Sequence, residues 1–597
     1  MHRKKIRKFL GWFEKNPYDA FTAVFIAMFT MLLLQNVHEG LAVTDEATYL
    51  LMADAFSNGN FEIWNGYEET PANELVIGWT TVQNGKLYGA YPMLYPVIVY
   101  PFYKIFGFIG LFIVNVVSFA IVLWLIYLLC NLLLGDKLLS SFAVVTYAFF
   151  TYAMKFSIEL WPHSLSLCLV LASVFLVLRS FYANGSLFLA GLLSGTAIGI
   201  RYTDVLFSMV LFIFIMFKFR RGLASFSAGL FLPVFLLLSA NSYVYGSPFG
   251  TGYSGVSMQV VYAAIALFVL TAAFMSKVSI RFSFLIFIAL GITLSYALSL
   301  DLTMYTRVLY ADVVDIGAFP EQGQGVWWYK KSLLQSTPLF ILALIAPVMM
   351  HRRKVNKDTI LILVILSVIE PLFFSTRMHH GGDVLTMRYL LEATPFLAIM
   401  SCYVIRNSIR LENFGRWEIF IAIGTFMALV FASMLVLDPD QFIYSSIFVF
   451  RVLPLIIAAL LLITVLCGKR AAPVLFFLLI FAYSYCFLTA VTDLVESSGA
   501  RYENMFKTAE LLGGIEDNSL VMFGNSTDIM FTAPAKLEKG VRVAYLQKGT
   551  SSLEFYKRGI HRYVVVEKEY DIEGILLPLG YNYSIVETEN LKIAELK

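Results

Sequence analysis

Charged residues are scarce in this sequence. They make up 14% of its 597 positions, whereas soluble globular proteins carry about 25%. Hydrophobic residues account for 59%, and the chain holds 53 phenylalanines and 33 tyrosines. A single soluble domain, a disordered chain and a fibrous repeat are excluded, because none of them could shield that much apolar surface from water. The composition indicates a polytopic helical membrane protein in contact with membrane lipids.

A strong charge of one sign is also lacking. The formal net charge is +3 and no segment resembles a nucleic-acid-binding motif, so nucleic acid is excluded as a partner. The sequence has no Gly-rich phosphate loop and no HExxH or G-x-S-x-G motif. A disulfide framework outside the membrane is excluded as well, because all five cysteines lie in apolar runs, at Cys130, Cys168, Cys402, Cys467 and Cys486.

Long apolar runs dominate residues 20–495. A basic N-terminal segment precedes a run at 21–41, which is long enough to span a hydrocarbon core of ~30 Å. We expect a transmembrane helix there rather than a cleaved signal, with residues 1–19 cytoplasmic by the positive-inside rule. Further runs lie at 107–134, 139–154, 163–179, 186–200, 202–218, 223–243, 258–275, 282–300, 333–350, 359–375, 389–405, 417–437, 447–466 and 472–491. The predicted fold class is an all-α polytopic domain of about 13–15 transmembrane helices in the cell membrane.

The composition changes near residue 496, where charges become frequent. Short runs typical of strands lie at 520–523, 541–545 and 562–566, and helices are predicted at 502–512 and 552–558. We therefore predict that 496–597 form a small soluble α/β domain on the outer face of the membrane.

The predicted outer loop 43–106 begins with two adjacent acids, Asp45 and Glu46. Adjacent acids at a membrane boundary are costly unless they are solvated or paired. One interpretation is a solvated helix start with Thr44 as its N-cap. The other is a carboxylate that deprotonates an acceptor hydroxyl in an outer cavity. Glu159 and His163, in the next outer turn, are expected at the rim of the same cavity, although that turn could instead supply only interfacial anchors.

Two arginines are predicted at the same side of the membrane. Arg201 sits between two apolar runs, where it could reach lipid headgroups, bind a phosphate or pair with Asp204. Arg388 is expected at the N-terminal end of a helix, a favourable place for an anion. Early acids and later cations on one side would suit transfer from a lipid phosphate, with the acid activating an acceptor and the cations holding the leaving phosphate.

An ordered set of motifs resembles the GT-C superfamily of membrane glycosyltransferases, over about residues 15–495. Its nearest counterparts are members similar to protein O-mannosyltransferases and to the lipid A aminoarabinose transferase. The motifs are Asp45-Glu46, Tyr91-Pro92-x-x-Tyr95-Pro96, Trp161-Pro162-His163, Arg201-Tyr202-Thr203, Gly246-Ser247-Pro248-Phe249-x-Thr251-Gly252-Tyr253 and Arg388-Tyr389-Leu390-Leu391. The second acid, Glu159, is not part of an Asp-x-Asp, and this departure weakens a metal-dependent oligosaccharyltransferase reading.

The resemblance implies an inverting hexosyl- or pentosyltransferase. Its donor would be a polyprenyl-phosphate sugar and its acceptor a glycan, lipid or protein. Asp45 would be the general base, with Glu46 beside it and Glu159 as a second acid. Arg201, Arg388, Lys330 and Lys331 would contact the donor phosphate. The substrate-binding residues would be His163, Tyr91, Tyr95, Tyr253, His379 and His380.

Three alternatives and the metal question stay open. A secondary transporter would carry charges at the membrane midplane, and a lipid-linked glycan ligase would share the outer arginines without needing Asp45-Glu46. An outer-face scaffold without chemistry is the third. The sequence indicates no definite cofactor. His379 and His380 could bind a divalent metal ion, but the sequence shows no fixed third ligand for it, so the need for a metal stays open.

Overall fold

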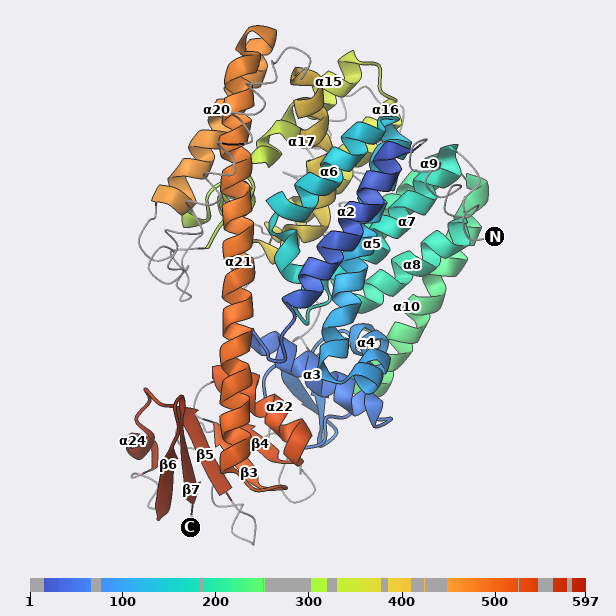
Figure 1. Ribbon diagram of the computed structural model, residues 1–597. Coiled ribbons are helices and arrows are strands. Elements are labelled where there is room, and N and C mark those ends of the chain that lie inside the picture. Colours follow the sequence, from blue (N-terminus) through green and yellow to red (C-terminus); the bar gives the residue numbers. More distant parts are fainter. Residues whose placement is uncertain are drawn as a thin grey trace, which may run out of the picture.

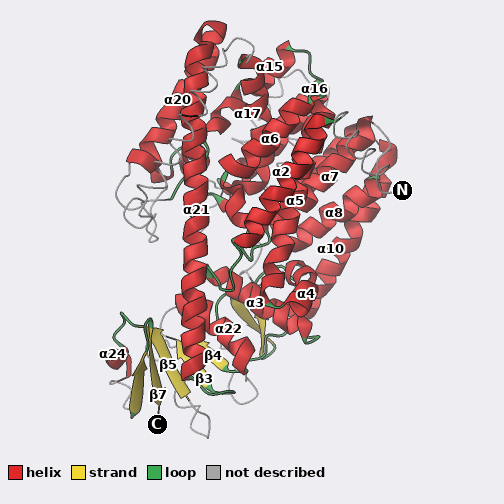
Figure 2. Ribbon diagram, in the orientation of Figure 1, coloured by secondary structure: helices red, strands yellow, loops and turns green. Residues whose placement is uncertain are grey.

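Helices lie side by side in an elongated bundle, with a small sheet at one end (Figures 1 and 2). Six helical segments are long and apolar enough to cross a membrane within the described residues. The computed structural model describes residues 16–65, 77–182, 186–218, 220–250, 252, 302–318, 330–376, 385–409, 424, 448–523, 526–545, 562–576 and 582–596. The helical membrane domain and the small C-terminal α/β domain predicted from the sequence are thereby confirmed.

The six long segments centre on α2 (Pro17–Gln35), α5 (Phe108–Leu134), α7 (His163–Tyr182), α10 (Leu223–Tyr245), α17 (Thr394–Ser408) and α21 (Ala472–Gly514). The shorter helices are α3 (Thr44–Ser57), α4 (Leu94–Phe106), α6 (Lys137–Phe150), α8 (Leu187–Ile200), α9 (Val205–Lys218), α13 (Leu302–Val313), α14 (Leu333–Ser336), α15 (Ala346–Arg352), α16 (Lys357–Phe374) and α20 (Leu453–Cys467). Predicted spans at 258–275, 282–300 and 417–437 and the basic residues before 16 lie outside the described residues. The total of 13–15 spans stays a prediction.

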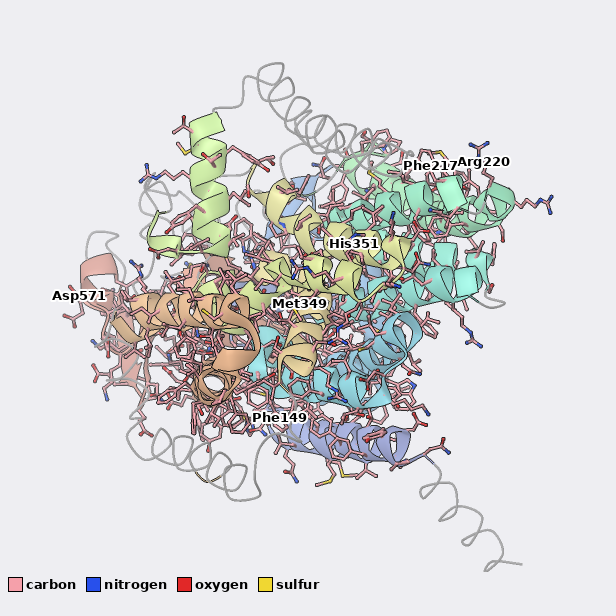
Figure 3. All side chains as sticks on the ribbon, turned by 90° about the horizontal axis from the view of Figure 1, so that it is seen from above. Phe149, Phe217, Arg220, Met349, His351 and Asp571 are labelled. Carbon is pink, nitrogen blue, oxygen red and sulfur yellow. The ribbon has the colours of Figure 1, made fainter. Side chains whose placement is uncertain are left out.

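The end of the bundle opposite the sheet carries exposed basic residues. They lie in the connection between α9 and α10 and around the end of α15, both away from the sheet in Figure 1, and they are Arg220, Arg221, His351, Arg352 and Arg353. Figure 3, seen from above, labels Arg220 and His351. Here the start of α2 is tied to the start of α6, because Lys137 Nζ lies 2.6 Å from Asp19 Oδ2. The exposed arginines at this end lie in loops that the positive-inside rule would assign to the cytoplasm.

Helices α8 and α10 touch backbone to backbone through glycines. A Cβ built at Gly191 would lie 2.0 Å from the Phe226 carbonyl oxygen, and one at Gly229 would lie 2.0 Å from the Phe188 carbonyl oxygen. Such an approach between membrane helices needs small residues. Because α8 ends at Ile200, this contact also sets the position of Arg201, which directly follows.

Two short elements cover the sheet-facing end of the bundle. Helices α3 and α4 pack together there, next to the hairpin of β1 (Thr80–Gln83) and β2 (Lys86–Gly89). Asn84 and Gly85 both have positive φ and make the turn of this hairpin. The Asn-Gly pair is a strong hairpin signal that our sequence analysis missed.

The C-terminal domain is a five-stranded mixed sheet that begins where α21 ends. Its order is β4-β3-β5-β7-β6, with β3 parallel to β4 and β5, and β7 antiparallel to β5 and β6. The strands are β3 (Leu520–Phe523), β4 (Arg542–Tyr545), β5 (Arg562–Glu567), β6 (Tyr583–Glu587) and β7 (Leu591–Leu596), with helices α22 (Ile529–Lys539) and α24 (Ile572–Leu576). The first three strands were predicted, whereas β6 and β7 were not.

Helix α21 joins the two domains without a linker. It is continuous over 43 residues, and the predicted boundary at 496 falls inside it (Figure 1). The helix predicted at 502–512 is the last part of α21, whereas the one predicted at 552–558 lies outside the described residues.

Side chains from the loop at 43–106 contact the C-terminal domain. Asn65 donates from Nδ2 to the Val543 carbonyl oxygen and accepts from the Val543 N–H, at 2.6 and 2.9 Å. Lys536 Nζ lies 5.2 Å from the centre of the Trp64 ring, and its side chain is buried. Burial lowers the pKa of Lys536 to about 8, with the Asp54 charge opposing this shift.

We predict that Gly191→Ala and Gly229→Ala each destabilise the protein by about 1–3 kcal/mol, because the added methyl group meets backbone rather than a movable side chain. The measurement is thermal unfolding in detergent. Gly499→Ala on α21 is the control, since nothing lies within 4 Å of its Cβ. Unfolding temperatures equal to that of the control would contradict the close approach of α8 and α10.

We predict that Lys536 makes stability rise between pH 8 and 10. The unfolded lysine keeps its proton up to about its ordinary pKa of 10.5, whereas the folded one loses it near 8. The unfolded state therefore binds more protons in this window, and the free energy of unfolding increases with pH by on the order of 2 kcal/mol. Thermal unfolding at pH 7.5 and 9.5 should show this gain for wild type relative to Lys536→Met. An equal response of both proteins would refute it.

Candidate active site

Asp45 and Arg388 meet although 343 positions separate them in the sequence. Arg388 Nη1 donates to Asp45 Oδ2 at 2.8 Å, and the two side chains are 14% and 15% exposed. Asp45 lies in the first turn of α3, which starts at Thr44 with Val43 at the cap position, so Thr44 is not the N-cap. Arg388 starts the short 3₁₀ helix η7 (Arg388–Ala393), which leads into α17, as predicted. Both side chains of the pair are therefore mostly buried but partly exposed.

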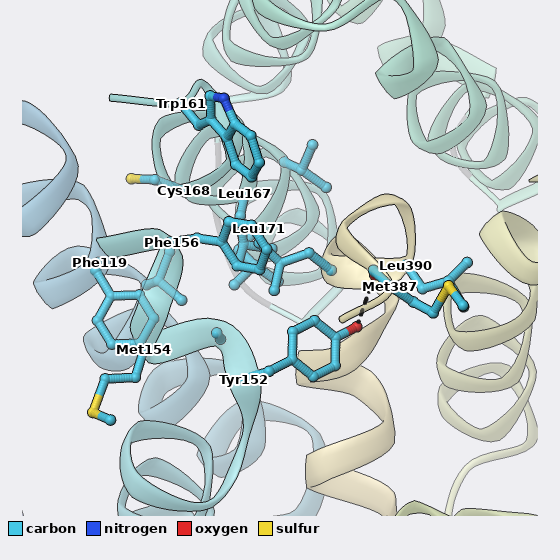
Figure 4. Close-up of a cluster of buried hydrophobic side chains, with 14 of the residues drawn as sticks. Phe119, Tyr152, Met154, Phe156, Trp161, Leu167, Cys168, Leu171, Met387 and Leu390 are labelled. Atoms are coloured by element: carbon cyan, nitrogen blue, oxygen red, sulfur yellow. Dashed lines mark hydrogen bonds between the residues drawn. The ribbon is translucent and has the colours of Figure 1, made fainter. Parts of the chain in front are cut away.

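The guanidinium of Arg388 rests on aromatic rings. Its Cζ lies 4.6 Å from the centre of the Trp161 ring and 5.1 Å from that of Tyr389. Trp161 stacks on Phe156, and Figure 4 shows both rings within a cluster of buried apolar side chains that includes Leu171 and Leu390. Contact between a cation and a ring face is attractive, and it holds the guanidinium in one orientation.

A second arginine lies in the same cluster. Arg201 follows the C-terminal end of α8 and forms an ion pair with Glu392, which is fully buried at the end of η7. His163 Nδ1 lies 3.9 Å from Glu392 Oε1, and the charges of both Arg201 and Arg388 act on this imidazole. Trp161 lies next to His163 with ring centres 5.6 Å apart. The structure therefore brings Asp45, Arg388, His163 and Arg201 together in one contiguous group.

Glu46 points away from this group. Its side chain is fully buried and forms a two-pronged ion pair with Arg501 of α21, with N–O distances of 2.8 and 3.0 Å. It also accepts the backbone N–H groups of Ala42 and Leu160. The structure thus gives each carboxylate oxygen two donors, which leaves Glu46 with an anchoring role rather than the site role we predicted.

Glu159 is likewise buried. Ser497 of α21 donates to its Oε1 at 2.8 Å, and Lys155 Nζ lies 3.6 Å from the same oxygen. Burial raises the pKa of Glu159, while the Lys155 charge opposes that shift. Its backbone carbonyl accepts from Asn115, so this segment is fixed on both sides.

The two predicted phosphate-binding lysines are buried beside acids. Lys331 Nζ lies 2.7 Å from Asp493 Oδ1 on α21, and both side chains are at most 2% exposed. Lys330 is also buried, and its charge acts on Asp312 of α13. The structure does not place either lysine against Asp45 or Arg388.

The predicted substrate-binding tyrosines support α3. Tyr91 stacks on Tyr49 with ring centres 4.6 Å apart, and Tyr95 meets the same ring edge-on at 5.1 Å. Tyr95 is fully buried, and its hydroxyl accepts from Asn115 at 2.9 Å. Tyr253, His379 and His380 lie outside the described residues, so their roles stay predictions. No group of metal-ligand side chains occurs among the residues that the structure describes, and the metal question stays open there.

Sequence reasoning missed Glu392, Asp493 and Arg501. Glu392 lies in η7, and its partner Arg201 stands 191 positions earlier in the sequence, so no local spacing pointed to it. Asp493 and Arg501 stand eight apart on α21, which fits one face. The eight-residue spacing of Asp493 and Arg501 at the end of an apolar run could have indicated that the helix continues with polar residues along one buried face.

Solved structures with the same architecture exist. ArnT from Cupriavidus metallidurans bound to undecaprenyl phosphate matches with a TM-score of 0.56 at 13% identity, over 97% of this chain and 98% of ArnT. An Archaeoglobus fulgidus oligosaccharyltransferase tethered with an acceptor peptide containing the NVT sequon matches with a TM-score of 0.50 at 13% identity, over 93% and 70%. The protein has the GT-C fold. No protein-family model and no curated protein sequence matches the chain.

The GT-C fold agrees with the resemblance drawn from the motifs. The match to ArnT spans both chains almost completely, so it includes the C-terminal sheet as well as the membrane helices. At this identity the likeness concerns the fold alone, and the activity rests on the site.

We predict that Lys331 and Asp493 form a structural pair. Asp493→Asn should destabilise the protein by about 3 kcal/mol, because it leaves a buried ammonium without its counter-charge. The double variant Lys331→Met/Asp493→Leu should recover most of that loss in thermal unfolding, since it buries no unpaired charge. A double variant that stays as unstable as Asp493→Asn would contradict the structural pairing.

Proposed function

We propose that this protein is an inverting glycosyltransferase that moves a sugar from a polyprenyl-phosphate donor to an acceptor hydroxyl at the outer face of the membrane. The observation that carries the proposal is the partly exposed contact between Asp45 and Arg388. It joins an acid that can accept a proton to a cation that can hold a phosphate, and sugar transfer from a lipid phosphate needs both.

In the proposed reaction the donor phosphate takes the place of Asp45 on Arg388. A guanidinium binds phosphate oxygens in the same two-pronged way as it binds a carboxylate. The released Asp45 accepts the proton of the acceptor hydroxyl while that oxygen attacks the anomeric carbon. The bond between this carbon and the phosphate oxygen breaks, and its electron pair leaves with the phosphate. Arg388, with Arg201 next to it, stabilises the charge that develops there.

The choice of a lipid-linked donor has two supports. The first is the likeness to ArnT solved with undecaprenyl phosphate. The second is the pair of arginines, Arg201 and Arg388, grouped around His163 where the described helices end near α3. A phosphate on a lipid carrier arrives from the bilayer, and this group lies at the start of α7 and the end of α8, two apolar helices. The acceptor would be a glycan, a lipid or a protein, as expected from the sequence.

The proposed orientation follows from charge. Exposed basic residues gather at the end of the bundle away from the sheet (Figure 1), and this supports a cytoplasmic start of α2. Asp45, Arg388 and the C-terminal domain would then face outward. A transporter is not favoured, since the four grouped side chains lie at the ends of α3, α7, α8 and η7 rather than at the centre of long apolar helices.

We predict that Asp45→Asn lowers sugar transfer by about 10²–10⁴-fold, because a positioned general base contributes on that order. Its affinity for undecaprenyl phosphate should equal or exceed that of the wild type, since Asp45 no longer competes for Arg388. Arg388→Gln should lose that binding instead. The measurement is transfer from labelled polyprenyl-phosphate sugars in membranes, with undecaprenyl phosphate binding measured separately.

The matched control is Glu62→Gln, an acid in the same outer loop that pairs with Lys86. It should transfer sugar like the wild type. Full sugar transfer by Asp45→Asn would contradict the role of Asp45 as the general base. Solute uptake into sealed vesicles that is the same in the wild type and in Asp45→Asn would favour a transporter.

A further inference from the structure

One face of α21 carries polar side chains at every fourth position where the helix leaves the membrane domain. Asp493, Ser497 and Arg501 form this stripe, and all three are buried. They bond to Lys331, Glu159 and Glu46 respectively. Each partner belongs to a different outer segment, so α21 holds three segments of the site region in place.

Arg501 is the most enclosed member of the stripe. Its side chain is fully buried, donates to both oxygens of Glu46 and also donates to the Gly40 carbonyl oxygen at 2.8 Å. The guanidinium lies 4.5 Å from the centre of the Phe112 ring on α5. Arg501 therefore binds α21, α5 and the start of α3 together.

Glu46 lies next to two residues that contact the Arg388 guanidinium, Asp45 and Trp161. It is the neighbour of Asp45 in α3, and it accepts the N–H of Leu160, the neighbour of Trp161. Asp45 bonds to Arg388, and Trp161 carries its guanidinium. A single carboxylate thus fixes the backbone on either side of the arginine that would receive the phosphate.

The start of α3 is also held from α21 by Asn504, which donates from Nδ2 to the Leu41 carbonyl oxygen at 2.9 Å. Its cap residue is Val43, which supplies no side-chain hydrogen bond. A helix start without a capping side chain loses about 1 kcal/mol relative to a capped one. In its place Glu46 reaches back to the N–H of Ala42 at 2.6 Å, and Arg501 keeps the carboxylate there.

We propose that Arg501 is a positioning residue, which through Glu46 sets Asp45 and Trp161 around Arg388. This assigns a part in the transfer step to α21, the helix that leads into the C-terminal domain, and that part of the inference rests on the proposed function. Small displacements of reacting groups reduce rates strongly, so loosening this anchor should affect turnover more than binding.

The test compares Arg501→Gln, Arg501→Lys and the matched control Lys507→Gln on the same helix. Lys507 forms ion pairs with Glu503 and with Glu567 of the C-terminal sheet. Among the described residues, it forms no ion pair with α3. Hydrogen exchange is measured for the amides of residues 41–49 and 158–162 in detergent. In Arg501→Gln both segments should exchange at least tenfold faster, whereas Lys507→Gln leaves them unchanged and Arg501→Lys falls between.

Activity and binding supply the second readout. At saturating donor, turnover of Arg501→Gln should fall at least tenfold, while its affinity for undecaprenyl phosphate changes less than threefold. If Arg501→Gln does not fold, the pair Glu46→Gln/Arg501→Gln is measured in its place, because it leaves no unpaired buried charge.

The outcomes separate this inference from the proposed function. Unchanged exchange in both segments, or equal loosening by Lys507→Gln, overturns the positioning role. Loss of turnover matched by an equal loss of undecaprenyl phosphate affinity overturns it too. If the wild type transfers no sugar, the proposed function fails, and the exchange data alone decide whether Arg501 fixes α3 and the 160 segment.

Discussion

The buried ion pair between Glu46 and Arg501 is the constraint on which the half of this protein next to the sheet depends. A charge taken out of water is tolerated only when its partners are complete, and breaking such a pair costs about 3–5 kcal/mol. Here both side chains are fully buried, and four donors surround the carboxylate. The pair can form in one arrangement of α3, α21 and the 160 segment, so it selects that arrangement over others of similar apolar packing.

The same logic runs along α21. Asp493 and Arg501 would be ordinary surface residues of a soluble helix, yet each is paired inside the protein. This is why the domain boundary could not be read from composition. Charges do become frequent near residue 496, but the helix does not end there, because its charged face continues to pack against α3 and the 160 segment. The change in composition marks where α21 leaves the apolar helices, and the helix itself continues to Gly514.

Much of the architecture follows from local sequence patterns. The apolar runs gave the membrane helices, and the β-branched runs gave β3, β4 and β5. Asp45 and Arg388 could be chosen because a lone polar group beside an apolar run needs a reason to be there. Their direct contact, 343 positions apart, is a tertiary fact that no local pattern contains. For the same reason Glu46, Glu159 and Lys331 looked like site residues, since their partners on α21 lie at least 162 positions away.

The arrangement around Arg388 joins two demands that usually conflict. A guanidinium that is to bind phosphate must be exposed enough to be reached, and an arginine near apolar rings must be paired. Asp45 pairs with the guanidinium before a phosphate is bound, and in the proposed reaction the phosphate then replaces it. Trp161 contacts the guanidinium in both states. An acid that has released its cation is then beside the bound phosphate, where an acceptor hydroxyl needs it. In the proposed reaction, arrival of the donor is therefore what makes the base available.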